Sequence, residues 1–137
     1  MNRRALLIAC AVWPLRADDA QKVWDLFTQM AADLSDDKPE EFLSAFHPST
    51  PGLETLRADV TGILRQSEVH SSIELLSETG DNVARSVELD WFLQIVEKLD
   101  TAAVTRRRER VRCRLIQQKK KWTITSFEPV NFFAPPQ

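Results

Sequence analysis

The first part of the chain carries apolar residues at helical spacing. Asp18 and Asp19 are suited to cap a helix, and after them apolar side chains recur every three or four positions, as expected for one buried helical face. The residues of this face are Val23, Trp24, Phe27, Met30, Ala31 and Leu34. The pattern predicts a first helix that begins near Asp18.

Two shorter helical patterns follow. The segment Asp37-Lys38-Pro39-Glu40 resembles a capping box with proline inside the first turn, and it predicts a short helix that carries Phe42, Leu43 and Phe46. Residues 47–52, which contain two prolines and a glycine, break the chain. A third helical face then comprises Leu53, Leu56, Val60, Ile63 and Leu64, with Gly62 near its end. Three helices are therefore predicted before any strand.

From Val69 onward apolar and polar residues alternate, which is the period of a half-buried strand. Turns are predicted at residues 79–82, near 100–102 and at 117–121. The second strand should present Val83, Val87, Leu89, Trp91, Leu93 and Ile95 on one face, with Arg85 as a charged exception, and the last strand carries Trp122, Ile124 and Phe127. The predicted fold class is α+β, with three N-terminal helices packed on a strongly curved four-stranded antiparallel meander.

The segment TRRRERVRCRL, residues 105–115, holds six arginines. A hairpin that turns symmetrically about Thr101 places three apolar pairs on one face of the sheet: Trp91 with Val111, Leu89 with Cys113 and Val87 with Leu115. The same register places Asp90 opposite Arg112 and Glu88 opposite Arg114 on the other face. Because a slip of one residue would oppose apolar and charged side chains, the parity is strongly constrained. The arginines are thus expected to line an outer sheet surface rather than a phosphate site.

The N-terminus MNRRALLIACAVWPLRA resembles a secretory signal peptide. It has a positive start at Arg3 and Arg4, a continuous apolar stretch over residues 5–12, and Ala17 as a residue that can precede cleavage. We predict a signal peptide over residues 1–17 and a single domain over residues 18–137. A weaker alternative is a lipobox ending at Cys10. The protein is then expected to be exported, to the periplasm or the medium, or to stay in the cytoplasm if this segment is retained.

Composition supports a single domain and argues against nucleic acid as a partner. The chain has 137 residues, 43% of them hydrophobic, with 18 basic and 20 acidic side chains. Cleavage after Ala17 would remove three of the 18 basic residues and none of the acidic ones, which leaves a formal charge of −5. Only Cys113 of the two cysteines would remain, so an internal disulfide is excluded. No later segment is long and apolar enough to span a membrane.

Helices followed by a long antiparallel meander, ending in the segment KWTITSFEPVNFF of residues 121–133, resemble the nuclear transport factor 2-like superfamily. The final Pro-x-x-Phe-Phe is similar to that of exported bacterial members. The resemblance covers residues 18–133 and implies a cone in which helices cover the concave sheet face around an internal ligand pocket. It also implies that a homodimer can form through the outer sheet face, for which Glu88, Asp90, Arg110, Arg112 and Arg114 are the candidate residues.

Within such a cone, the natural pocket lining is aromatic: Trp24, Phe27, Phe46, Trp91 and Phe127. The alternative is that this set is plain core. The inward parity of the third strand continues to Glu109 and Arg107, which would bring two ionisable groups to the open end of the cone unless the strand bends and lets both reach water.

No catalytic set is evident. The chain has no tyrosine, which excludes the tyrosine-containing oxyanion hole implied by a likeness to ketosteroid isomerases. His47, Glu109 and Arg107 are the weak catalytic candidates, and His70 near Glu68 lacks a nucleophile in a recognisable setting. Two separated histidines and one cysteine do not form a metal site, and no glycine-rich phosphate loop is present, so neither metal nor cofactor is expected.

Two functional hypotheses remain. The first is a non-catalytic module that binds a small apolar ligand or a protein partner. The second is a small acid–base enzyme, a lyase, isomerase or hydrolase, with His47 or Glu109 as the base. The missing tyrosine favours the first.

Overall fold

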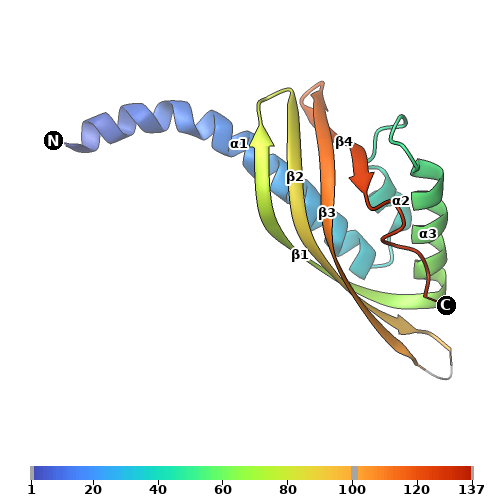
Figure 1. Ribbon diagram of the computed structural model, residues 1–137. Coiled ribbons are helices and arrows are strands. Elements are labelled where there is room, and N and C mark those ends of the chain that lie inside the picture. The colour runs from blue at the N-terminus through green and yellow to red at the C-terminus, as the bar shows by residue number, and fades with distance from the viewer. Residues whose placement is uncertain (1, 100–101, 137) are drawn as a thin grey trace.

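Three helices precede four strands along the chain. The computed structural model describes the backbone of residues 2–99 and 102–136 and the side chains of residues 18–99 and 102–136. Within these ranges the elements are α1 (Asn2–Ser35), α2 (Pro39–Leu43), α3 (Leu53–Gln66), β1 (Ser67–Gly80), β2 (Ala84–Glu97), β3 (Val104–Gln118) and β4 (Lys121–Glu128). The strands form one antiparallel sheet in the order β1-β2-β3-β4, which bends so that the helices lie against one of its faces (Figure 1). The predicted α+β architecture is confirmed.

α1 begins earlier than the apolar pattern predicts. Asp18 and Asp19 lie inside its range, so the prediction that they cap its N-terminus is wrong. The residues just before them, Leu15-Arg16-Ala17, are all good helix formers, so the local sequence has no reason to start a helix at Asp18. The predicted buried face is confirmed, because Val23, Phe27, Met30 and Leu34 are each about 1% exposed or less. The predicted signal peptide, residues 1–17, lies outside the residues whose side chains are described.

The second helix is capped differently from the prediction, and the third is confirmed. The N-cap of α2 is Lys38, without a side-chain hydrogen bond, because Asp37 adopts the left-handed conformation (φ 58°) that ends α1. Pro39 occupies the first turn as predicted. Phe46 lies beyond α2 and forms a parallel bridge with Ile124 of β4. α3 buries Leu56, Val60, Ile63 and Leu64, as its sequence predicts.

The inner face of the sheet, which is turned toward the helices, is apolar along β2, β3 and β4. Its buried residues on β2 and β3 are Val87, Leu89, Trp91, Leu93, Ile95, Val111, Cys113 and Leu115. Val83 was predicted on this face but belongs to the β1–β2 turn and is 60% exposed. Between β3 and β4, Leu115 pairs with Ile124 and Arg114 with Ser126, so Thr125 is the extra residue of a bulge in β4. The bulge shifts the alternation by one residue and lets both Ile124 and Phe127 face inward.

The β2–β3 register differs from the prediction by two residues. Trp91 lies opposite Glu109, Leu89 opposite Val111 and Val87 opposite Cys113, while Asp90 faces Arg110 and Glu88 faces Arg112. The turn is centred one residue earlier than predicted, since Val96 pairs with Val104 and the Glu97 N–H donates to the Ala103 carbonyl. Moving the centre by one residue moves every partner by two. The parity of the faces is therefore preserved, as the apolar pattern requires.

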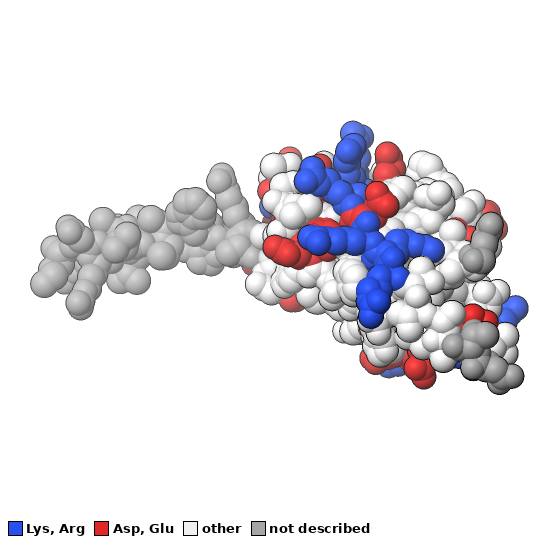
Figure 2. Space-filling model, turned by 60° about the horizontal axis from the view of Figure 1, so that its bottom comes forward, with Lys and Arg blue, Asp and Glu red and all other residues white. Residues whose placement is uncertain are grey.

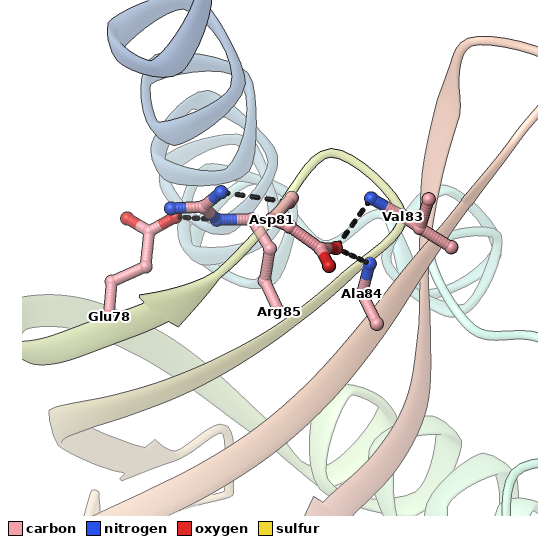
Figure 3. A network of polar contacts seen from close by, with 5 residues as sticks. All are labelled: Glu78, Asp81, Val83, Ala84 and Arg85. Atoms are coloured by element: carbon pink, nitrogen blue, oxygen red, sulfur yellow. Dashed lines mark hydrogen bonds and ion pairs between the residues drawn. The ribbon is translucent and has the colours of Figure 1, made fainter.

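Arg85, the charged exception on the inner face, is neutralised at the β1–β2 turn (Figure 3). Its Nε lies 2.6 Å from Oε2 of Glu78, and both side chains are about 90% buried. Nη1 also donates to the Asp81 carbonyl oxygen. The Asp81 carboxylate in turn accepts the N–H groups of Val83 and Ala84. This turn network explains how a charge can occupy an otherwise apolar row.

Candidate functional site

Four of the five predicted pocket residues meet in one aromatic cluster. Phe27, Phe46, Trp91 and Phe127 are at most 6% exposed, and the Trp91 ring lies edge-on to those of Phe27 and Phe127, with centroids 6.5 and 5.9 Å apart. Trp24 is only partly buried and packs against the outside of the core. Three further rings, those of Phe42, Phe132 and Phe133, complete the cluster. The predicted lining is thus the centre of the hydrophobic core.

The C-terminal segment, residues 129–136, inserts its aromatic side chains into the cone. The Phe133 ring is fully buried, with centroids 5.0–5.6 Å from those of Phe132, Phe42, Trp91 and Phe127. These rings come from α2, β2 and β4 as well as the segment itself. Phe133 therefore fills the space between the helices and the inner face of the sheet.

The C-terminal segment runs along α3 (Figure 1), and two glycines allow the close approach. A side chain on Gly52 would meet Val130 at 2.8 Å, and one on Gly62 would meet Pro135 at 3.3 Å. Gly62, an unfavourable residue in a helix interior, is therefore explained by packing. Arg107 of β3 adds a polar anchor, because its guanidinium donates to the Phe132 carbonyl oxygen.

A cavity of about 460 Å³ remains at the open end of the cone, next to the β2–β3 hairpin. We call it the mouth cavity. Its floor is the inner sheet face at Ser67, Ile95 and Thr105, and its walls are the end of α3, Lys98 of the hairpin and Pro136. The Lys98 ammonium donates to the Leu64 carbonyl at the C-terminal end of α3. The cavity thus combines a floor of one apolar and two hydroxyl side chains with cationic groups at its edge.

The two ionisable residues predicted at the open end of the cone lie in different surroundings. Glu109 is exposed, whereas Arg107 is half-buried and bonded to the C-terminal segment. The residue that Arg107 influences is Asp59 of α3, which sequence reasoning missed because helix and strand positions far apart in the chain show no shared pattern. Burial raises the pKa of Asp59, and the positive charge of Arg107 acts in the opposite direction.

Both histidines are in structural or solvent-facing positions. The backbone N–H of His47 donates to the Ile124 carbonyl of β4. Its Nδ1 accepts the Ser49 N–H at 3.1 Å and lies 2.7 Å from the Ser49 hydroxyl. His47 therefore organises the turn before α3. His70 is exposed on β1.

The outer sheet face carries alternating charges. Asp90 is held by the Arg108 guanidinium, whose Nη2 lies 2.5 Å from Oδ2, and this hydrogen bond lowers the pKa of the Asp90 carboxyl. Nε of Arg112 lies 3.6 Å from Oε1 of Glu88. Arg110 and Arg114 are exposed on the same face. Figure 2 shows basic side chains gathered on one face of the molecule with acidic ones beside them.

The remaining chemical groups are inert or scattered. Cys113 is buried on the inner face, and burial raises the pKa of its thiol far above the ordinary value, so the reactive thiolate is not formed near neutral pH. Among the side chains that the structure describes, no three His, Cys, Asp or Glu residues are grouped as metal ligands. Over the same residues, no helix has the length and apolar character needed to cross a membrane.

Comparisons with known proteins give structural but not sequence relatives. No family model and no curated protein matches this chain. A conserved protein from Planctomyces limnophilus superposes with a TM-score of 0.73 at 8% identity, over 81% of this chain and 94% of its own. A proposed scytalone dehydratase from Novosphingobium aromaticivorans superposes with a TM-score of 0.72 at 8% identity, over 82% of this chain and 83% of its own. A proposed dehydratase of the nuclear transport factor 2-like family from Streptomyces avermitilis superposes with a TM-score of 0.62 at 10% identity, over 81% of this chain and 94% of its own.

At sequence identities this low, the structural matches establish the fold alone. The curved four-stranded meander, the three helices ahead of it and the structural neighbours agree on one architecture. The chain has the nuclear transport factor 2-like fold.

Proposed function

We propose that this protein is a non-catalytic binding module that takes a small apolar ligand at the mouth cavity. The observation that carries the proposal is the filled interior. Phe133 is in contact with four other rings at the centre of the cone, where a substrate would otherwise meet an acid and a base. Among the described residues, the polar residues that are buried as a whole, Asp33, Thr50 and Ser67, come from three different parts of the chain. The buried ion pair of Glu78 and Arg85 belongs to the β1–β2 turn.

The lining of the mouth cavity suits a mainly apolar ligand that carries one anionic group. Its volume of about 460 Å³ is within the range of small-molecule sites. Ile95 offers an apolar floor, while two positive charges, Lys98 and Arg65, outnumber the one carboxylate of the lining, Glu97. An apolar body with an anionic group would satisfy both.

We also propose that two copies associate through the outer sheet face. Acidic residues on β2 and arginines on β3 form adjacent stripes, so a two-fold axis parallel to the strands would bring each stripe against the opposite charge of the second copy. Phe92, half-buried beside Asp90 and Arg108, provides an apolar centre for this contact, with Glu88, Arg110 and Arg112 around it and Arg114 at its edge.

The ligand proposal is tested with anilinonaphthalene sulfonate, which has an apolar ring system and one anionic group. We expect saturable binding to the wild-type protein, followed by fluorescence. Thr105→Trp fills the floor of the mouth cavity and should weaken binding about tenfold or more, the loss expected for about 1.4 kcal/mol of contact. Val104→Trp is the matched control, because it places the same ring on the opposite face of β3, and it should leave binding unchanged.

Two results would contradict the proposal. One is a wild-type protein that does not bind the probe, or binds it equally well after Thr105→Trp. The other is turnover of a carbonyl or hydroxy substrate that is lost on His47→Ala or Glu109→Gln, since this would establish the alternative of a small acid–base enzyme.

A further inference from the structure

One row of residues across the outer sheet face differs in chemistry from its neighbours. The register places Thr79 of β1, Ser86 of β2, Arg114 of β3 and Ser126 of β4 side by side. We call this set the Arg114 row. In the next row, Arg112 lies between two carboxylates, Glu88 on β2 and Glu128 on β4. The Arg114 row places a guanidinium between hydroxyl groups, with no acidic residue.

The groups of the Arg114 row are available to a ligand. Among the described residues Arg114 is exposed and makes no ion pair, in contrast to Arg108 and Arg112. Two surface cavities of about 380 and 320 Å³ are both lined by Thr79, Ser86 and Arg114. The first extends over the next row to Glu88, Arg112 and Glu128. The β4 bulge at Thr125 lies in the second cavity and adds a fourth hydroxyl, which donates to the Arg114 carbonyl at 3.3 Å. A hollow therefore exists above the row.

We propose that the Arg114 row binds a tetrahedral oxyanion, the phosphate or sulfate group of a small ester. The guanidinium fork matches two oxygens of such a group, and the flanking hydroxyls can donate to the others. Strand neighbours lie about 4.8 Å apart, so Ser86 and Ser126 reach the anion from both sides of Arg114. Arg112 lies between the Glu88 and Glu128 residues of the next row and offsets part of their negative charge, which limits repulsion of the anion.

This site is separate from the mouth cavity and from the centre of the dimer surface. Arg108 and Arg114 are six residues apart on one strand, about 20 Å along β3. The mouth cavity lies on the opposite face of the sheet. Occupation of the Arg114 row can therefore be tested independently of both.

The test is a titration of the full-length protein with inorganic phosphate, followed by NMR of the arginine Nε–H and backbone amide signals. We expect saturable shifts at Ser86, Arg114 and Ser126. Arg114→Gln should weaken binding about tenfold or more, the effect of losing one charge-assisted pair. Arg112→Gln is the comparison variant in the neighbouring row, and it should weaken binding much less than Arg114→Gln, because it only unmasks the Glu88 carboxylate. Because Arg114 is exposed, the variant should keep the thermal stability of the wild type.

Phosphoserine and glucose 6-sulfate then separate the two sources of the oxyanion. Tighter binding of the first identifies a phosphate ester and tighter binding of the second a sulfate ester, and either supports the site. The proposal is overturned if no signal of the row shifts, or if Arg112→Gln weakens binding as much as Arg114→Gln. It is also overturned if Arg114→Gln changes only self-association, because the row would then be a contact between copies.

Discussion

At the scale of single residues, Arg85 illustrates what periodicity can and cannot predict. Alternation along β2 correctly placed it on the inner face, but the pattern contains no information on its partner. Glu78 reaches it across the β1–β2 pair, where a bulge after Leu75 changes the alternation of β1. Buried charges of this kind persist only when they are paired and hydrogen-bonded.

Replacing one partner of this pair should lower the free energy of unfolding more than replacing both. Glu78→Leu leaves the Arg85 charge buried with only the Asp81 carbonyl, and we expect a loss of about 2–3 kcal/mol in the free energy of unfolding. The double variant Glu78→Leu/Arg85→Met should recover most of that loss, because neither charge then needs a partner. Urea denaturation of the wild type, both single variants and the double variant measures the coupling. Additive single and double effects would show that the pair is not coupled.

At the scale of elements, the sequence predicted which helices and strands exist better than how they begin and pair. Long apolar repeats identified α1, α3 and the four strands, because burial of one face imposes a period of 3.6 or 2. The α2 cap and the β2–β3 register were wrong, since each depends on the backbone conformation of one or two turn residues, such as Asp37 and Ala102 at positive φ. Similar apolar patterns are compatible with either register.

The Asp81 turn between β1 and β2 should make stability depend on pH. Hydrogen bonds from the Ala84 and Val83 N–H groups lower the pKa of Asp81 below the usual 3.8, so the folded state binds its proton less tightly than the unfolded chain. The stabilisation is complete above the usual value and is lost as the pH falls through the lowered one. Asp81→Asn keeps an acceptor without a charge. The wild type should melt at a higher temperature than this variant at pH 7, and the difference should shrink in acid. A difference that is independent of pH would contradict this account.

At the scale of the whole molecule, the candidate site was only partly predictable. The aromatic residues Phe27, Phe46, Trp91 and Phe127 were identified from the apolar faces of helices and strands and from the cone that the resemblance implies. Their cluster is closed by Phe132 and Phe133, from a segment without helix or strand. Such a segment has no periodicity to analyse, so its return to the centre of the cone could not be derived from the pattern. The mouth cavity was missed for the same reason, as Pro136 forms part of its wall.

The proposed association of two copies also belongs to this scale. Phe92→Asp places a charge at the apolar centre of the outer face and should convert a dimer to a monomer in sedimentation velocity. Val83→Asp makes the same chemical change at the exposed β1–β2 turn and should leave the sedimentation coefficient unchanged. A wild-type protein that sediments as a monomer at all concentrations up to the millimolar range would contradict the proposed dimer.

A variant with an opened interior provides a positive control for benzene binding. Phe133→Ala should lower the free energy of unfolding by about 3–5 kcal/mol, because it removes a fully buried ring and leaves a cavity. The new cavity, lined by aromatic side chains, should then bind benzene, as engineered apolar cavities in other proteins do. This variant supplies the signal expected from an open cone.

The most direct test of the central claim is a benzene titration of the wild-type protein, followed by NMR of the Trp91 indole and the Phe133 ring. The filled interior predicts that neither signal shifts, because Phe133 already occupies the centre of the aromatic cluster. A saturable shift of both signals would show an open internal pocket and would contradict the account of a packed, non-catalytic cone.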